Sequence, residues 1–188
     1  MHHLIIRMVV LISIVIISGC ASMGPGTVSE KRSAILKMKE DVLAELFRAK
    51  PDTRAQIQSA PGYAVFSNAN LNIFFVAAGT GYGVAKDMQT QSHTYMNMAE
   101  AGVGLGIGAK DYRLIIVFHK REALNNFIQN GWSFGGNADA AVIASSKGVA
   151  VQTEMYYGDL TVYTFTETGL ALQATLKGSK FWKDKNLN

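Results

Sequence analysis

The sequence predicts an α+β fold, with N-terminal amphipathic helices packed on a curved, mainly antiparallel sheet or partial β-barrel. Apolar residues recur at helical spacing up to residue 59, and short apolar or alternating segments separated by turns follow Gly62. The chain has 188 residues, 48% of them hydrophobic and 17% charged. That composition is typical of an ordered globular protein with one substantial core.

Residues 1–19 have the layout of an export signal. Arg7 supplies positive charge, Met8–Ile17 is apolar apart from Ser13, and Ser18-Gly19 ends the segment with small residues. The apolar run is short for a permanent membrane span, which needs about 20 residues. A retained anchor beginning at Leu4 is the alternative interpretation.

The single cysteine, Cys20, follows this leader directly. The stretch Ile17-Ser18-Gly19-Cys20 resembles the lipobox of bacterial lipoproteins, which implies lipidation of the Cys20 thiol, cleavage before it and acylation of the new amine. Two or more acyl chains hold a protein stably on a membrane. Ala21-Ser22, with no Asp after the cysteine, resembles outer-membrane sorting. We therefore expect a lipid-anchored protein of the bacterial cell envelope, on the outer membrane and facing the periplasm.

The rest of the chain divides into a spacer and one domain. Residues 20–28 are predicted to be a flexible tether, because they contain Gly24, Pro25 and Gly26. Residues 29–188 are predicted to form the domain.

Three helices are predicted. The first is Ser29–Lys50, with Ser29 as its N-cap, an apolar stripe on one face and Pro51 as its stop. Lysines and glutamates alternate along its polar face, which favours packing on a core over lying in a membrane. Asp52–Ser59 is expected to be a second, short helix. Lys120–Asn130 is the third, with Gly131 as a natural stop.

The remaining segments alternate or are apolar in the manner of strands, with polar or glycine-containing turns between them. The predicted strands are Tyr63–Ser67, Ile73–Ala85, Thr90–Met98, Ala101–Ala109, Tyr112–His119, Asp139–Ser145, Val149–Tyr157, Leu160–Thr166 and Leu170–Leu176.

Glycines recur at every second position in two places, first at Gly79, Gly81 and Gly83. The second set is Gly102, Gly104, Gly106 and Gly108. In a strand this spacing puts each set on one face and leaves a smooth backbone groove. Either a neighbouring element packs into that groove, or the second set forms a slot for a flat or extended ligand such as an acyl chain. The spacing does not match a phosphate-binding loop.

Basic and aromatic residues gather near the C-terminus, where they suit an anionic membrane surface. The candidate lipid-binding residues are Lys177, Lys180, Phe181, Trp182, Lys183 and Lys185. In the alternative interpretation, Phe181 and Trp182 cover the core while the lysines are solvated.

Several chemistries are not expected. A formal charge of +4 is too small by itself to indicate a nucleic-acid partner, and one cysteine excludes both an internal disulfide and a zinc site of several thiolates. We expect no metal, no cofactor and no catalytic residues. His119 beside Lys120-Arg121 fits a surface position better than a general base. An enzyme would have to use Ser145, Ser146 or Asp139. The sequence around these residues is typical of a strand and the turn that follows it, and not of a catalytic site.

The glycine-rich strands and three further segments together resemble the SYLF domain, also called the Ysc84-type domain. The three segments are Gly62-Tyr63-Ala64-Val65-Phe66, Trp132–Val142 and Tyr163–Gly178, and the similarity extends from about Ile35 to Trp182. The resemblance implies lipid binding, because eukaryotic members bind phosphoinositides or acidic phospholipids. Some members also contact actin, a property that we do not carry over to a bacterial envelope.

The sequence therefore supports a hypothesis with one alternative. The leading hypothesis is a non-enzymatic envelope lipoprotein whose domain binds membrane phospholipids, in particular anionic ones. The alternative is a tethered interaction or structural module that binds another envelope protein or forms a homo-oligomer.

Overall fold

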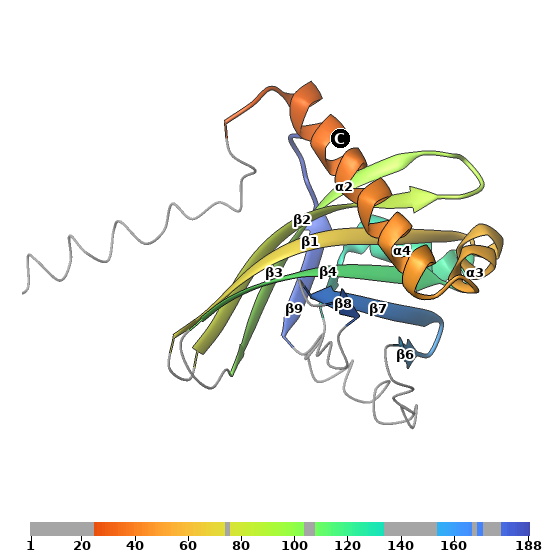
Figure 1. Ribbon diagram of the computed structural model, residues 1–188. Coiled ribbons are helices and arrows are strands. Elements are labelled where there is room, and N and C mark those ends of the chain that lie inside the picture. The colour runs from red at the N-terminus through yellow and green to blue at the C-terminus, as the bar shows by residue number, and fades with distance from the viewer. Residues whose placement is uncertain (1–24, 74–75, 104–107, 134–153, 167–168, 171–177) are drawn as a thin grey trace, which may run out of the picture.

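The computed structural model in Figure 1 describes residues 25–73, 76–103, 108–133, 154–166, 169–170 and 178–188. It confirms the α+β class. The helices are α2 (Val28–Ala49), α3 (Thr53–Ser59) and α4 (Arg121–Asn130). The strands are β1 (Gly62–Ile73), β2 (Val76–Asp87), β3 (His93–Val103), β4 (Gly108–Phe118), β5 (Trp132–Ser133), β6 (Glu154–Tyr157), β7 (Leu160–Thr166), β8 (Gly169–Leu170) and β9 (Ser179–Lys183).

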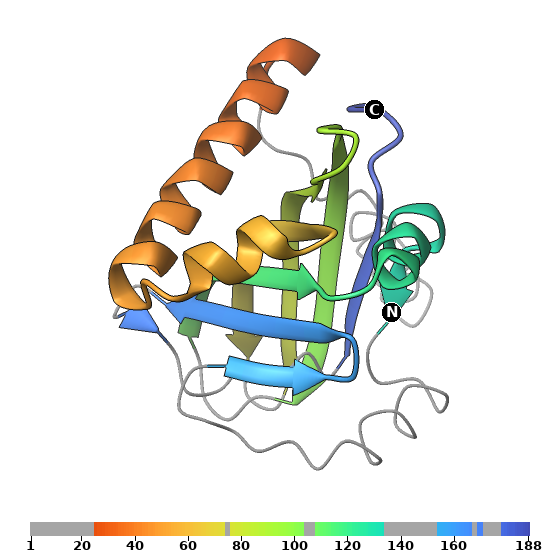
Figure 2. The same ribbon diagram turned by 90° about the vertical axis from the view of Figure 1, so that its right-hand side faces the viewer.

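The described strands form one 9-stranded sheet in the order β5-β9-β3-β2-β1-β4-β7-β6, with β8 paired to β7. All of these pairings are antiparallel. The order has two ends, at β5 and β6, so the described strands form an open sheet and not a closed barrel. The sheet is strongly curved, and β7 and β6 run crosswise to β3 and β9 (Figure 2).

Helix α2 begins with a capping box. Thr27 Oγ1 accepts a hydrogen bond from Glu30 N at 3.2 Å, and Glu30 Oε2 accepts one from Thr27 N at 2.7 Å. The prediction that Ser29 caps this helix is therefore wrong. Thr27 offers the same kind of hydroxyl group, and only Thr27 has a glutamate three residues later to complete the pair.

One face of the sheet, which we call the α2 face, is covered by α2 and α3. Val42 and Leu46 pack with Tyr63 and Val65 of β1, and Ile35 packs nearby with Val84 and Tyr95. Helix α2 lies along this face, as predicted from its apolar stripe (Figure 1).

The opposite face, which we call the α4 face, carries the aromatic part of the core. Phe66 of β1, Phe127 of α4 and Phe181 of β9 pack together there with Phe118. Figure 2 shows α2 and α4 on opposite sides of the sheet. The domain therefore has a helix on each side of a single curved sheet.

The central strands differ from the prediction in length and in one connection. Strand β1 runs to Ile73 and pairs along its whole length with β2, so it is much longer than Tyr63–Ser67. The predicted strand Ala101–Ala109 is wrong, because Ala101–Val103 ends β3 and Gly108-Ala109 begins β4. Strands β3 and β4 lie on opposite sides of the β1–β2 pair. The alternating pattern continues across both strands without a polar turn residue to mark the change.

The later strands agree in part. Leu160–Thr166 is β7, as predicted, and β6 forms the end of the predicted Val149–Tyr157. Asp139–Ser145 and most of Leu170–Leu176 lie outside the described residues. Strands β5 and β9 were not predicted as strands.

Candidate functional site

The predicted lipid-binding residues at the C-terminus separate into surface and core. Lys180, Lys183 and Lys185 are exposed, and Lys177 lies outside the described residues. Phe181 is only 1% exposed, and its ring centroid lies 4.9 Å from that of Phe66. The prediction of Phe181 as a surface lipid contact is therefore corrected, because its ring completes the aromatic core.

Trp182 lies on the other side of β9 from Phe181. Side chains alternate along a strand, so Lys180 and Trp182 share the α2 face while Phe181 faces the α4 face. Trp182 is half-buried and is paired in register with Asn97 of β3. The anchoring of Phe181 in the core thereby fixes Lys180 and Trp182 on the opposite side of β9, whereas the exposed Lys183 ends the strand on the side of Phe181 and the exposed Lys185 follows the strand. We call Lys180, Trp182, Lys183 and Lys185 the β9 patch.

The second glycine set does not form one strand face. Gly102 belongs to β3 and Gly108 to β4, while Gly104 and Gly106 lie outside the described residues. Two strands, β2 and β1, separate β3 from β4 in the sheet. The premise of a groove along one strand is therefore wrong for Gly102 and Gly108, and an acyl-chain slot at these glycines stays untested.

The first glycine set has a packing role. Gly83 lies beneath the Phe66 ring, and Gly79 and Gly81 lie beneath the Asn68 side chain, where an added Cβ would meet these groups. Phe66 and Asn68 belong to the neighbouring strand β1 and are paired in register with Gly83 and Gly81. A neighbouring element thus fills this groove, which was one of the two interpretations of the pattern.

The space over these glycines allows a polar cluster to form on the α4 face. Asn68 Nδ2 reaches across β2 and donates to Glu100 Oε2 at 2.8 Å, and Tyr112 OH donates to the same oxygen at 2.6 Å. Burial and the charge and hydrogen bond of Glu100 raise the pKa of Tyr112, so its phenol stays protonated. Among the described residues, Asn68 Oδ1 is a buried acceptor without a hydrogen-bond partner.

A basic cluster lies on the α2 face, where α2 crosses the β2–β3 hairpin. We use this name for Lys39, Lys86 and His93. Lys39 Nζ lies 3.3 Å from His93 Nε2, and Lys86 is paired in register with His93. Lys39 is 6% exposed and Lys86 is 9% exposed, which is unusual for lysine.

Burial and the neighbouring charges shift the pKa values of His93 and Lys86 in the basic cluster. Burial lowers the pKa of His93, and the charges of Lys39 and Lys86 lower it further, whereas Glu40 raises it. Burial and the charge of Lys39 likewise lower the pKa of Lys86, whereas the charge of Asp87 raises it. The carboxylate next to Lys39 is that of Glu40, at 2.9 Å from Nζ. The cluster therefore holds more positive than negative charge.

The basic cluster was not predicted from the sequence, although the position of Lys39 indicates it. Lys39 follows Ile35 by four residues and precedes Val42 by three, so it occupies the buried stripe of α2 and not the polar face. His93 falls within the predicted strand Thr90–Met98, and it is the first residue of β3. The register that places Lys86 opposite His93 depends on the length of the β2–β3 turn.

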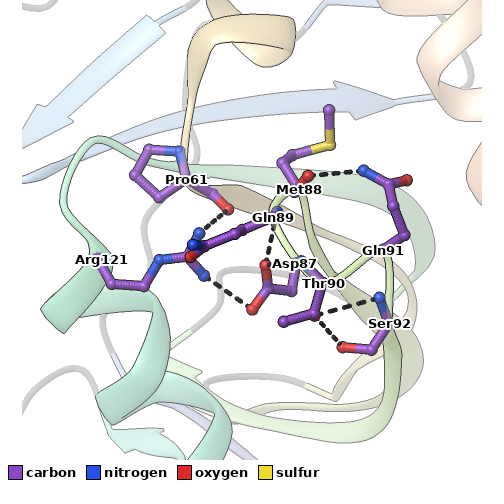
Figure 3. A network of polar contacts seen from close by, with 8 residues as sticks. All are labelled: Pro61, Asp87, Met88, Gln89, Thr90, Gln91, Ser92 and Arg121. Atoms are coloured by element: carbon purple, nitrogen blue, oxygen red, sulfur yellow. Dashed lines mark hydrogen bonds and ion pairs between the residues drawn. The ribbon is translucent and has the colours of Figure 1, made fainter.

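A separate ion pair fastens α4 to the β2–β3 turn (Figure 3). Arg121 Nη1 donates to Asp87 Oδ2 at 2.7 Å, and Arg121 Nη2 donates to Pro61 O at 3.3 Å. Asp87 Oδ1 also accepts bonds from the backbone N–H groups of Gln89 and Thr90. Burial opposes the charge of Asp87, but these bonds outweigh it and lower the pKa of the carboxyl group. The contacts fix the turn on which the basic cluster depends.

Of the residues considered for catalysis, the structure describes His119. His119 is exposed just before α4, as expected, and its Nε2 lies 2.6 Å from Thr161 Oγ1. Asp139, Ser145 and Ser146 lie outside the described residues, as do the leader and Cys20. Within the described ranges no three His, Cys, Asp or Glu side chains are grouped to hold a metal, and no helix is long and apolar enough to span a membrane.

These features define an α+β domain with an open, curved antiparallel sheet, a helix on each face, and basic and aromatic groups on its surface. The comparisons with known proteins are consistent with this class. Residues 99–188 match the family model described as "Ysc84: Las17-binding protein actin regulator". The resemblance predicted from sequence is thus confirmed for this part of the chain, which contains the β9 patch.

The chain is also similar to a protein named "Beta cell expansion factor A" from Aeromonas veronii. The two are 34% identical over 165 residues, which cover 88% of this chain and 62% of that relative. The chain thus spans less than two thirds of the relative's length. The basic cluster lies within residues 1–98, before the segment that matches the Ysc84 family.

Proposed function

We propose that this protein is a lipid-anchored envelope protein whose domain binds anionic phospholipid surfaces through the β9 patch. The observation that carries the proposal is the alternation along β9, where the buried Phe181 holds Lys180 and Trp182 on the opposite face. Exposed ammonium groups suit anionic headgroups, with each lysine near such a surface contributing about 1 kcal/mol. A half-buried tryptophan suits the interface between headgroups and acyl chains.

The proposed anchor complements this weak surface binding. The leader and Ile17-Ser18-Gly19-Cys20 support export and lipidation, and Ala21-Ser22 supports the outer membrane as the destination. A tether raises the effective concentration of the domain at the membrane. Modest intrinsic affinity at the β9 patch is therefore sufficient. No catalytic step is part of this proposal.

The test is flotation of the full chain with Cys20→Ser, which removes the acyl anchor, on neutral and anionic vesicles at low and high salt. The expected result is extra binding to anionic vesicles at low salt, reduced by the triple change Lys180→Gln, Lys183→Gln and Lys185→Gln. Salt weakens contacts between exposed charges. Both proteins keep the leader, so its own membrane affinity cancels in the comparison.

A matched control removes three exposed cations elsewhere, through Lys37→Gln, Arg48→Gln and Lys120→Gln. This control is expected to keep most of the salt-sensitive binding. Equal losses in both triple variants would show that net charge alone matters and would contradict a defined β9 patch. Binding that is indifferent to both salt and headgroup charge would contradict the proposal altogether.

A second candidate is a module that binds another envelope protein or forms a homo-oligomer. The observation in its favour is the description of the matching family, which names a Las17-binding protein and actin regulator. That description concerns the family and names no bacterial partner. A discrete oligomer of the Cys20→Ser chain in light scattering, together with failure to float on anionic vesicles, would favour this alternative.

A further inference from the structure

We propose that the basic cluster binds an oxyanion of the phosphate type between Lys39 and Lys86 and against the ring of His93. The inference rests on the proposed function and deepens it by assigning a second contact for a headgroup phosphate, on the α2 face and away from β9. It also stands on geometry of its own. Three nitrogen-bearing side chains from three different elements converge at this point.

The fold fixes the positions of the three side chains. Lys86 and His93 are directly opposite each other on β2 and β3, which puts their Cβ atoms roughly 5 Å apart. Lys39 comes from the buried stripe of α2, and its Nζ lies 3.3 Å from His93 Nε2. Lys86 Nζ donates to Gln91 O in the β2–β3 turn. Each group is therefore held in place before any ligand binds.

The charges around this point leave an excess of positive charge. Helix α2 contributes Lys39 and Glu40, β2 contributes Lys86, β3 contributes His93, and β1 contributes the neutral phenol of Tyr63. Asp87 adjoins Lys86 but points to the other face, where it bonds to Arg121. The charge of Asp87 still raises the pKa of Lys86, but Asp87 is itself paired with Arg121. Of the charged groups named here, Glu40 is the carboxylate on the α2 face beside the two buried ammonium groups, and burying charge without full compensation is costly.

The carboxylate of Glu40 is the natural competitor for an incoming anion. Its side chain is 69% exposed, so it can rotate into solvent when another anion approaches Lys39. A phosphate offers several acceptor oxygens, while each lysine offers three donors in charge-assisted hydrogen bonds. A bound phosphate also favours the protonated imidazole, because it replaces repulsion from the two lysines with attraction. Free phosphate and a lipid headgroup share this chemistry.

The experiment is a phosphate titration of the full chain, followed by NMR of the His93 ring, with chloride at matched ionic strength as the reference. Inorganic phosphate is expected to shift the His93 resonances in a saturable manner and to raise the pKa of His93. The change Lys39→Gln is expected to weaken phosphate binding by about tenfold, as the loss of one charge-assisted contact. Glu40→Gln is expected to strengthen phosphate binding, because it removes the competitor.

Lys37→Gln is the matched control, since Lys37 lies on the same helix but is exposed and paired with Asp41. It is expected to leave the phosphate affinity unchanged. If Lys39→Gln fails to fold, the phosphate affinity of Glu40→Gln tests the proposal by itself, because Glu40 lies on the surface and its replacement should not disturb the fold. No saturable shift of His93, or equal effects of Lys37→Gln and Glu40→Gln, would overturn the proposal.

Vesicles identify the source of the phosphate. Binding of a lipid headgroup predicts that vesicles containing a lipid phosphomonoester perturb the His93 ring, whereas neutral vesicles do not. A response to inorganic phosphate without a response to these vesicles would assign the site to a free phosphate. Flotation through the β9 patch is measured independently, so it can fail while the His93 titration succeeds, and the reverse.

Discussion

The side-chain amide of Asn188 bonds to both backbone groups of Tyr95. Tyr95 N donates to Asn188 Oδ1 at 2.9 Å, and Asn188 Nδ2 donates to Tyr95 O at 2.8 Å. The amide thereby continues the pairing of β3 where β9 ends, since β9 pairs with β3 from Met96 onward. It also keeps Leu187 packed against Ile35 of α2.

Asn188→Ala is expected to lower the free energy of unfolding by about 1 kcal/mol, because two backbone groups of Tyr95 lose this partner. Denaturant unfolding followed by circular dichroism measures the change. Asn186→Ala is the control, since the Asn186 side chain is exposed. Equal stability of both variants would show that Tyr95 does not depend on the amide.

Asp87→Asn is expected to destabilise the domain by about 1–3 kcal/mol at pH 7, because it weakens a charge-assisted bond at a carboxyl group whose side chain is 12% exposed. The folded pKa of Asp87 lies below its ordinary value of 3.8, so the carboxylate contributes stability above that pH. The contribution is lost as the pH falls from 3.8 through the folded pKa.

Unfolding by urea between pH 2 and pH 7 tests the Asp87 prediction. The variant is expected to lose less stability on acidification than the parent chain. Asp41→Asn removes an exposed i,i+4 pair with Lys37 and is expected to cost at most about 0.5 kcal/mol. Parallel acid profiles of parent and Asp87→Asn would contradict the assignment.

His93 is expected to make the stability of the domain depend on pH in a second, higher range. Its folded pKa lies below 6.5, so the unfolded chain takes up the proton more readily than the folded chain. Stability is therefore expected to fall as the pH decreases from 6.5 through the folded pKa. His93→Gln keeps an acceptor for Lys39 and is expected to flatten the profile in that window. An unchanged profile would mean that His93 titrates normally.

Gly83→Ala is expected to destabilise the domain by about 1–3 kcal/mol, since the added methyl group would overlap Val65 O and the Phe66 ring. Gly79→Ala is expected to cost less, because its nearest contacts, at 3.0–3.1 Å, include the Asn68 side chain, which can shift. Thermal unfolding compares the two variants. A larger loss at Gly79 than at Gly83 would contradict the packing described.

Changes at Phe181 and Trp182 separate the core from the proposed lipid-binding surface. Phe181→Ala is expected to lower the free energy of unfolding by about 3–5 kcal/mol. The milder Phe181→Leu is expected to fold and to keep salt-sensitive flotation. Trp182→Ala is expected to change stability much less and to weaken flotation. If Phe181→Leu has normal stability but no longer floats with vesicles, Phe181 contacts lipid directly and the correction made above is wrong.

The sequence was informative wherever one local pattern decided the structure. The apolar stripe of α2, the glycine after α4 and the β7 segment are local signals, and these elements formed as predicted. Local patterns did not reveal which strands are neighbours. Ala101–Ala109 alternates like a single strand, yet its two ends pair with different partners, β2 for Val103 and β1 for Gly108.

The same limit applies to the candidate sites. Phe181 sits among lysines in the sequence, and only the pairing of β9 with β3 shows that its ring reaches Phe66. The basic cluster needs the crossing of α2 over a hairpin, which no short segment encodes. Lys39 was nevertheless detectable as a cation within an apolar stripe, and such a break in pattern is a useful signal for a site.

The partnership of Phe66 with Gly83 has an evolutionary consequence. The Phe66 ring and the backbone oxygen of Val65 both occupy the place of the missing side chain, so a smaller residue at position 66 would clear only one of the two. A side chain at position 83 would also need the backbone of β1 to move, and packed interiors adapt poorly to added volume. Descendants of this chain should therefore keep glycine at position 83 whether or not Phe66 is retained, while position 66 varies more freely.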